Sequence, residues 1–236
     1  MAALGRQRLV RRLGSIGLVD EVFLQYANIL TEIRTFPPNG DAQTLGGKVD
    51  QFLDHTLNRI AVLFSTYTGR HAHVSLKLLD GPKKQVRTIA RDQTSVANRG
   101  AIDETLGWFP YADNTAFNHI LTDPGAKYFL SNHLRVMALF GRYKNIRPDW
   151  KQYYRACLVV PITLSSHGAA IHDGTVWGFL TVDNRGGGFD ATCSCALLQS
   201  FARMYYSVLG ELSTIPAADI MSTARASAAN SRGPSQ

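Results

Sequence analysis

Two apolar segments followed by an amphipathic helix, all in the C-terminal half, constrain the fold of this 236-residue chain most strongly. Residues 154–164 and 175–184 are largely apolar, and three consecutive glycines at 186–188 end the second segment. This pattern predicts two strands joined by a loop. Between about residues 190 and 213, apolar residues recur at steps of three and four. That spacing predicts a helix with a seam for pairing with another helix, formed by Leu198, Phe201, Tyr205, Val208 and Leu212.

The first part of the chain combines two helices with a β-hairpin. Apolar residues at helical spacing predict one helix over 18–35 and another from about 44 to 67, separated by the breaker sequence Pro37-Pro38-Asn39-Gly40. Over residues 71–79, apolar and polar side chains alternate, and Asp80-Gly81-Pro82 leads into a second strand over 85–92. The alternation predicts a hairpin that buries one face.

Residues 93–150 are the least regular part of the sequence. A short helix is predicted from Asn114 to Leu121, and a further strand or helix over 128–140. Connections rich in asparagine, glycine and aromatic residues commonly cover a ligand pocket. We therefore expect this segment to form the cover of a pocket, and the strands to form its floor.

The net charge of +7 is concentrated in two segments, residues 70–99 and 127–155. A basic surface attracts anions such as nucleotides, nucleic acids, anionic lipids or acidic protein surfaces. A solvated basic surface without a specific partner explains the same composition. The cations and aromatic residues interleaved over 143–155 leave two interpretations open as well, since they suit either a planar anionic ligand or packing at the edge of the sheet.

The order of these elements, over roughly residues 44–213, resembles that of GAF domains. The residues that carry the resemblance are Val160-Pro161-Ile162, Gly178-Phe179-Leu180-Thr181-Val182, Phe189, Leu197-Leu198 and Phe201-Ala202. The resemblance implies an α+β fold with a central antiparallel sheet. The N- and C-terminal helices would pack on one face of this sheet, and loops with short helices would cover the other. It also implies a pocket under that cover, because GAF domains as a family bind cyclic nucleotides, tetrapyrroles, haem or small metabolites, and many dimerise.

Mapped onto this sequence, the resemblance and the strand alternation together give candidate ligand-binding residues. From the strands and their ends these are Ser75, Lys77, Arg91, Tyr154, Arg155, Thr181 and Asp183. The covering segment adds Asn114, Tyr128 and Asn145.

The sequence departs from the ligand motifs of known GAF branches. The motif associated with cyclic-nucleotide-binding members is absent as such, and no cysteine matches a site of bilin attachment. Cys193 and Cys195 fall at the start of the last helix rather than around a pocket, so the pattern of the methionine-sulfoxide reductase branch is also missing. His71 and His73 share one strand face, but no carboxylate or cysteine is placed to complete a metal site. We expect no metal and no cofactor.

No activated nucleophile is recognisable, so we expect a non-enzymatic protein. The expected function is that of a solo sensory module, without an output domain, that binds a small anionic ligand and signals through its terminal helices. The alternative is a degenerate GAF fold that serves only as a dimerisation or protein-interaction module. Salt-dependent nucleic-acid binding is a third, less favoured option.

The expected organisation has three parts: a basic segment with an amphipathic helix over 1–40, a GAF-like domain over 41–214, and a disordered tail over 215–236. The N-terminus lacks the apolar core of a secretory signal, and no apolar run approaches the length of a membrane span. We therefore expect a cytoplasmic protein, a homodimer or protein partner, and no membrane partner.

Overall fold

The structure is a computed structural model, and it describes residues 2–37, 40–123, 125–164 and 176–215. Within these ranges the strands form a six-stranded antiparallel sheet in the order β3-β2-β1-β6-β5-β4. The strand bounds are β1 Ala72–Asp80, β2 Gln85–Arg91, β3 Phe109–Pro110, β4 Phe129–Ser131, β5 Ala156–Ile162 and β6 Gly178–Asn184. The two predicted apolar strands are therefore present, as neighbours β5 and β6 at the centre of the sheet.

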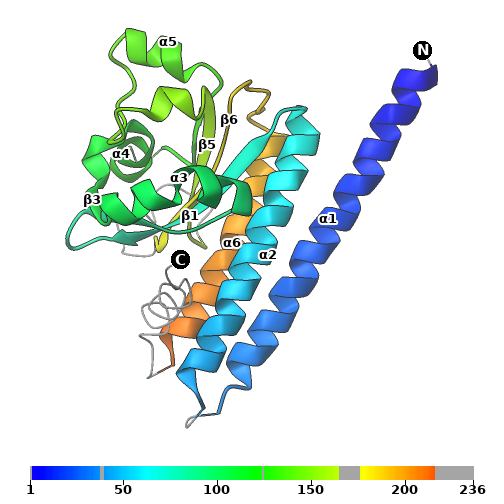
Figure 1. The fold of residues 1–236 in the computed structure, drawn as a ribbon, viewed down its shortest axis with the longest axis vertical. Coiled ribbons are helices and arrows are strands. Elements are labelled where there is room, and N and C mark those ends of the chain that lie inside the picture. The colour runs from blue at the N-terminus through cyan, green and yellow to red at the C-terminus, as the bar shows by residue number, and fades with distance from the viewer. Residues whose placement is uncertain (1, 38–39, 124, 165–175, 216–236) are drawn as a thin grey trace, which may run out of the picture.

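Three long helices lie on one face of the sheet (Figure 1): α1 Ala2–Arg34, α2 Ala42–Thr68 and α6 Cys193–Ser213. Asp41 caps α2 by accepting hydrogen bonds from the N–H groups of Gln43 and Thr44, and Gly69 ends it in the left-handed conformation with φ 66°. The larger core cluster fills the space between these helices and the sheet. Its sheet side chains are every second residue of the central strands, including Val74, Leu158 and Val182.

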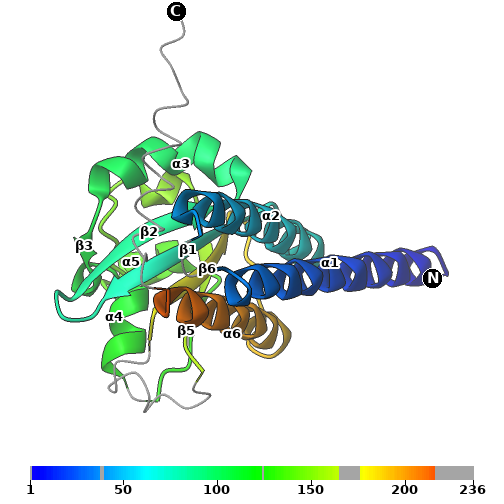
Figure 2. The ribbon, with the colours of Figure 1, turned by 90° about the horizontal axis from the view of Figure 1, so that it is seen from below.

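The opposite face of the sheet is covered by shorter elements (Figure 2): α3 Gln93–Leu106, α4 Thr115–Thr122 and α5 Leu134–Leu139, with 3₁₀ turns at Tyr111–Asp113 and Trp150–Gln152. A second apolar cluster lies beneath them and includes Phe109, Phe117, Phe129, Tyr143 and Phe179. The predicted α+β class is confirmed, with terminal helices on one face and a cover of loops and short helices on the other.

The pairing of β1 with β6 requires glycine at one position. A Cβ atom at Gly178 would lie 1.9 Å from the carbonyl oxygen of Lys77 on the neighbouring strand. No side chain fits in that space, since real Cβ contacts essentially never fall below 3 Å. The glycine therefore permits the close approach of the two strands that carry most of the pocket floor.

Two details differ from the sequence-based expectations: the start of the first helix and the structure of the segment 93–150. The first helix begins at Ala2 rather than near residue 18, so Gly14 and Gly17 do not interrupt it. Its C-terminal part belongs to the main core through Val22 and Ile29, although its N-terminal end extends away from the rest of the molecule (Figures 1 and 2). The segment 93–150 contains an unpredicted helix, α3. The tail beyond residue 215 and most of the loop between β5 and β6 lie outside the described residues.

The predicted helix-pairing seam on α6 is not a surface. All five of its side chains are buried inside this chain, with exposed fractions between 0% and 6%: Leu198, Phe201, Tyr205, Val208 and Leu212. The ring of Phe52 on α2 lies 5.8 Å from that of Tyr205, and Phe23 on α1 lies 6.0 Å from Phe201. The seam pairs with helices of the same chain, so it is not available to a partner in this conformation.

Candidate functional site

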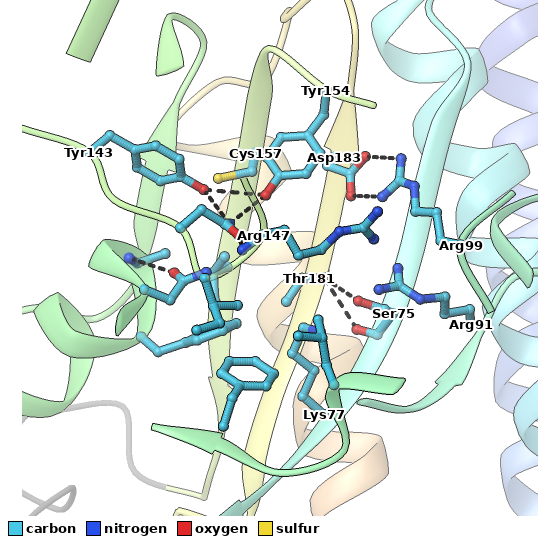
Figure 3. A pocket seen from close by; sticks show the side chains of 18 residues that line it. Ser75, Lys77, Arg91, Arg99, Tyr143, Arg147, Tyr154, Cys157, Thr181 and Asp183 are labelled. Carbon is cyan, nitrogen blue, oxygen red and sulfur yellow. Dashed lines mark hydrogen bonds and ion pairs between the residues drawn. The ribbon is translucent and has the colours of Figure 1, made fainter. Parts of the chain in front are cut away.

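A cavity lies between the sheet and its cover, on the face opposite the long helices (Figure 3). The side chains of Ser75 and Lys77 on β1, Thr181 and Asp183 on β6, and Cys157 on β5 point into it. They occupy alternate positions of adjacent strands, so the pleat of the sheet places all of them on one face. Arg91 at the end of β2, Tyr154 shortly before β5 and Val159 on β5 also line it. The covering segment supplies the remaining walls: Arg99, Leu106, Phe109, Asn114, Ala116, Phe117, Tyr143, Asn145, Ile146 and Arg147.

Two polar pairs form the floor of the cavity. Ser75 and Thr181 are opposite each other in the β1–β6 register, and their hydroxyl oxygens are 2.6 Å apart. The ammonium group of Lys77 donates to the Thr88 hydroxyl at 2.6 Å. The same group lies about 6 Å from the ring centres of Phe109 and Phe117. Lys77 is thus a buried cation held by a neutral hydroxyl and two aromatic rings.

A buried ion pair closes one end of the cavity. Both Nη atoms of Arg99 donate to the Asp183 carboxylate, at 2.8 and 2.9 Å. The guanidinium also lies 5.2 Å from the ring centre of Tyr153 and 5.7 Å from that of Tyr154. Burial alone would lower the pKa of Arg99, but the adjacent Asp183 carboxylate outweighs it and raises the pKa. Arg99 therefore stays charged, and it fastens α3 to the end of β6.

A neutral hydrogen-bonded cluster lies beside this ion pair. The Asn145 amide nitrogen donates to the Tyr154 hydroxyl at 2.6 Å and to the Tyr143 hydroxyl at 3.1 Å. Burial raises the pKa of both tyrosines and of the neighbouring Cys157 thiol well above their usual values. These groups are uncharged at neutral pH, so Cys157 is present as the thiol, which is not the nucleophilic form.

The lining is strongly basic. Among the described residues, the lining contains four cationic side chains, Lys77, Arg91, Arg99 and Arg147, and the carboxylate of Asp183. Arg147 is paired with a carboxylate outside this lining: its Nε and Nη2 atoms each donate to an oxygen of Asp149 at 3.2 Å. In Figure 3 the basic groups converge on the space above the Ser75–Thr181 pair. Cationic side chains that face one cavity create a positive potential there, which attracts an anion.

The cavity is small. The space open to the centre of a water molecule is about 70 Å³. One water needs roughly 10–15 Å³ on this measure, so the cavity holds about five waters or a compact group of similar size. In this conformation the space suits a small anion, whereas a nucleotide or tetrapyrrole would require the cover to move.

The structure brings eight of the ten predicted ligand-binding residues to this cavity: Ser75, Lys77, Arg91, Asn114, Asn145, Tyr154, Thr181 and Asp183. It does not bring Tyr128 or Arg155 there. Tyr128 packs against the main core on the helix side of the sheet. Arg155 lies just before β5, where its backbone bonds to Asn184 and Leu134 while its side chain is exposed.

Sequence reasoning missed several lining residues, of which Arg99 matters most. The segment 93–150 that contains it has no regular pattern, although Arg99 belongs to the basic region 70–99. Arg147 and Tyr143 belonged to the recognised run of cations and aromatic residues, but they were not selected individually.

In the parts of the chain that the structure describes, no group of three or more His, Cys, Asp or Glu is placed to hold a metal ion. None of the described helices is both long and apolar enough to cross a membrane.

No family model and no curated protein matches this chain. Among solved structures, it is similar to the GAF domain of an Acinetobacter phosphoenolpyruvate-protein phosphotransferase, with 13% identity, a TM-score of 0.46, and 83% of this chain and 96% of that chain covered. For the corresponding domain from Coxiella burnetii the values are 14%, 0.46, 80% and 92%. For a free methionine-R-sulfoxide reductase from Neisseria meningitidis they are 14%, 0.39, 81% and 96%.

The fold is GAF-like. This description rests on the chain's own architecture, with a central antiparallel sheet between terminal helices and a cover over a cavity. At identities this low, the similarity concerns the fold alone and does not identify a ligand or an activity.

Proposed function

We propose that this chain is a non-enzymatic GAF-like sensory module that binds a small anion in the cavity between the sheet and its cover. The observation that carries the proposal is the convergence of Lys77, Arg91 and Arg147 on the Ser75–Thr181 hydroxyl pair. Hydroxyl groups and cations are the donors that bind carboxylate and phosphate oxygens, and charge-assisted bonds of this kind are the stronger ones.

The size of the cavity narrows the ligand class. With about 70 Å³ of space, a compact anion such as a short carboxylate, a dicarboxylate or a phosphate group fits the closed conformation. The rings of Phe109, Phe117 and Tyr143 offer apolar contact to a short carbon skeleton. A small organic acid satisfies both the charged and the aromatic parts of the wall.

The signalling route follows from the two faces of the same strands. Ser75 and Thr181 face the cavity, while their neighbours Val74 and Val182 pack against the long helices. An anion that draws the cover onto the sheet favours the closed arrangement of 93–150, and any difference in strand position is transmitted to α2 and α6. This is a population shift, and its size is limited by the difference in ligand affinity between the two arrangements.

The test is a thermal-shift and calorimetry screen with small anions, followed by variants. Arg91→Gln and Arg147→Gln each remove one converging charge, and Arg142→Gln removes an exposed charge of the same segment as a matched control. A ligand at 100 times its dissociation constant stabilises the native state by about 2.7 kcal/mol, which is measurable as a rise in Tm. The proposal expects the rise to be lost in the cavity variants and kept in the control. An equal response in all three variants would refute it.

The alternative function is assembly without a ligand, and one observation favours it. On α1, Ile16 and Leu24 expose 57% and 60% of their surface on a helix whose N-terminal end extends away from the molecule. A second copy or another helical protein would cover them. Light scattering of Leu24→Glu tests this, with Leu139→Glu on α5, where the leucine is 81% exposed, as the control. Dissociation of an assembly by the first substitution alone supports assembly through α1, and a monomeric parent protein excludes it.

A further inference from the structure

A second, more open basic site lies beside the cavity. It is a groove lined by Arg70, His71, His73, Arg99 and Arg185, together with Thr94, Asn98, Tyr153 and Gly186. The space open to the centre of a water molecule is about 430 Å³, several times that of the inner cavity. Among these lining residues there are three arginines and two histidines but no carboxylate.

The inner wall of the groove contains two buried nitrogen atoms that have no hydrogen-bond partner among the residues that the structure describes: Nε of Arg99 and Nδ1 of His73. Arg99 is only 3% exposed, and its two Nη atoms are already bonded to Asp183. His73 Nδ1 lies 3.7 Å from Asp92 Oδ1, which is longer than a hydrogen bond. Buried polar atoms are normally satisfied. His73 contacts the Asp92 carboxylate, so Arg99 Nε is the donor in this wall that an acceptor oxygen of a ligand would satisfy.

The outer wall holds its cations in place without neutralising them. Arg185 donates from Nη2 to the carbonyl oxygen of Gln152 at 2.6 Å. Arg70 packs its side chain against Gly186, where an added Cβ would lie 2.7 Å from the arginine. A carbonyl oxygen and a glycine position these two guanidinium groups, but neither carries a charge, and Arg70 and Arg185 remain exposed to solvent.

Because the groove is open to solvent, the charge of a ligand determines how tightly it can bind there. An exposed charge pair contributes only about 0–1 kcal/mol because water screens it, so a singly charged anion would be held weakly. A ligand with several charges on closely spaced oxygen atoms can engage Arg70, Arg99 and Arg185 together, and planar guanidinium groups match phosphate oxygens well. We propose that this groove is a second anion site, distinct from the cavity, which binds a diphosphate group.

Inorganic pyrophosphate is the probe, titrated calorimetrically into the full chain. The double variant Arg70→Ser/Arg185→Ser is expected to weaken binding by about tenfold or more, since two exposed charge pairs are removed. The double variant Arg142→Ser/Arg203→Ser removes the same charge from exposed positions elsewhere and is expected to bind as the parent does. A nucleoside diphosphate is the second ligand, and equal affinity for both shows that the diphosphate alone is recognised.

A cavity variant separates this site from the proposed sensory function. Arg91→Gln, which alters the cavity but not the groove, is expected to leave pyrophosphate binding unchanged. The inference is overturned if pyrophosphate does not bind, if the two double variants lose affinity equally, or if Arg91→Gln abolishes binding while the groove variant retains it. If the parent protein binds pyrophosphate but no small anion, the sensory proposal alone is refuted.

Discussion

Replacing Asp92 by asparagine tests what holds the cover of the cavity in place. Asp92 is 2% exposed and stands immediately before α3. One carboxylate oxygen accepts the N–H of Val74 on β1 at 2.8 Å, and the other accepts the N–H of Ser95 in the first turn of α3 at 3.0 Å. The side chain thus clamps the start of α3, the helix that carries Arg99, onto the central sheet.

The pKa of Asp92 sets the size of the effect. Burial alone would raise it, but the contact with His73 and the hydrogen bonds from Ser95 and the Val74 N–H outweigh burial and lower it from 3.8 to about 2. A carboxyl with a lowered folded pKa stabilises the protein above its unfolded pKa, and this stabilisation is lost as the pH falls through the folded pKa. A shift of this size contributes about 2 kcal/mol at pH 7 and roughly half of that at pH 3.

The assay is urea denaturation of the parent protein and of Asp92→Asn at pH 7 and at pH 3, with Asp20→Asn on the exposed surface of α1 as the control. The amide keeps the shape but not the charge, so we expect a loss of about 2 kcal/mol at pH 7 and a smaller loss at pH 3. The control is expected to unfold as the parent does at both values. A difference that is the same at pH 3 and pH 7 would show that the carboxylate charge is not what holds α3.

Three further substitutions have definite expected outcomes. Gly178→Ala forces a methyl group against the Lys77 carbonyl and should cost at least about 3 kcal/mol of unfolding free energy, so a stability within 1 kcal/mol of the parent would contradict the strand geometry. Asp183→Asn leaves Arg99 buried without its partner, which should cost about 3 kcal/mol; it should also strengthen small-anion binding, and weaker binding by calorimetry would count against the proposed site. Asp41→Ala removes the α2 cap and should lower the midpoint of urea denaturation, whereas an unchanged midpoint would disprove the capping role.

The sequence was sufficient to predict which strand residues face the cavity, because side chains alternate between the two faces of a sheet and one face is buried against helices. Ser75 and Lys77 on β1, and Thr181 and Asp183 on β6, were predicted to share a face, and the register places all four there. The period of two leaves little freedom once one face is buried against helices. Arg155 shows the limit of this rule, since alternation places it on the cavity side but it lies just before Ala156, the first residue of β5.

The helix α3 could not be predicted from local pattern. Residues 93–106 contain few apolar side chains at helical spacing, and Val96 on this helix is 40% exposed. Its position depends on two long-range contacts, the Asp92 bond to Val74 and the Arg99 pair with Asp183, and a single sequence does not reveal such contacts. The partner of the α6 seam could not be predicted for a different reason. An apolar stripe has the same sequence pattern whether it packs against its own chain or against another.

The two proposed anion sites share Arg99, which leads to one more prediction. If pyrophosphate in the groove draws Arg99 away from Asp183, the Asp183 carboxylate is left facing the cavity, where it repels an anion. Calorimetric titration of the cavity anion should then give weaker binding in the presence of saturating pyrophosphate, and linkage requires the cavity anion to weaken pyrophosphate by the same factor. Asp183→Asn removes the repelling charge, so in that variant the mutual weakening should disappear while both ligands still bind. Equal weakening with and without the Asp183 carboxylate would show that the coupling, if present, does not pass through this ion pair.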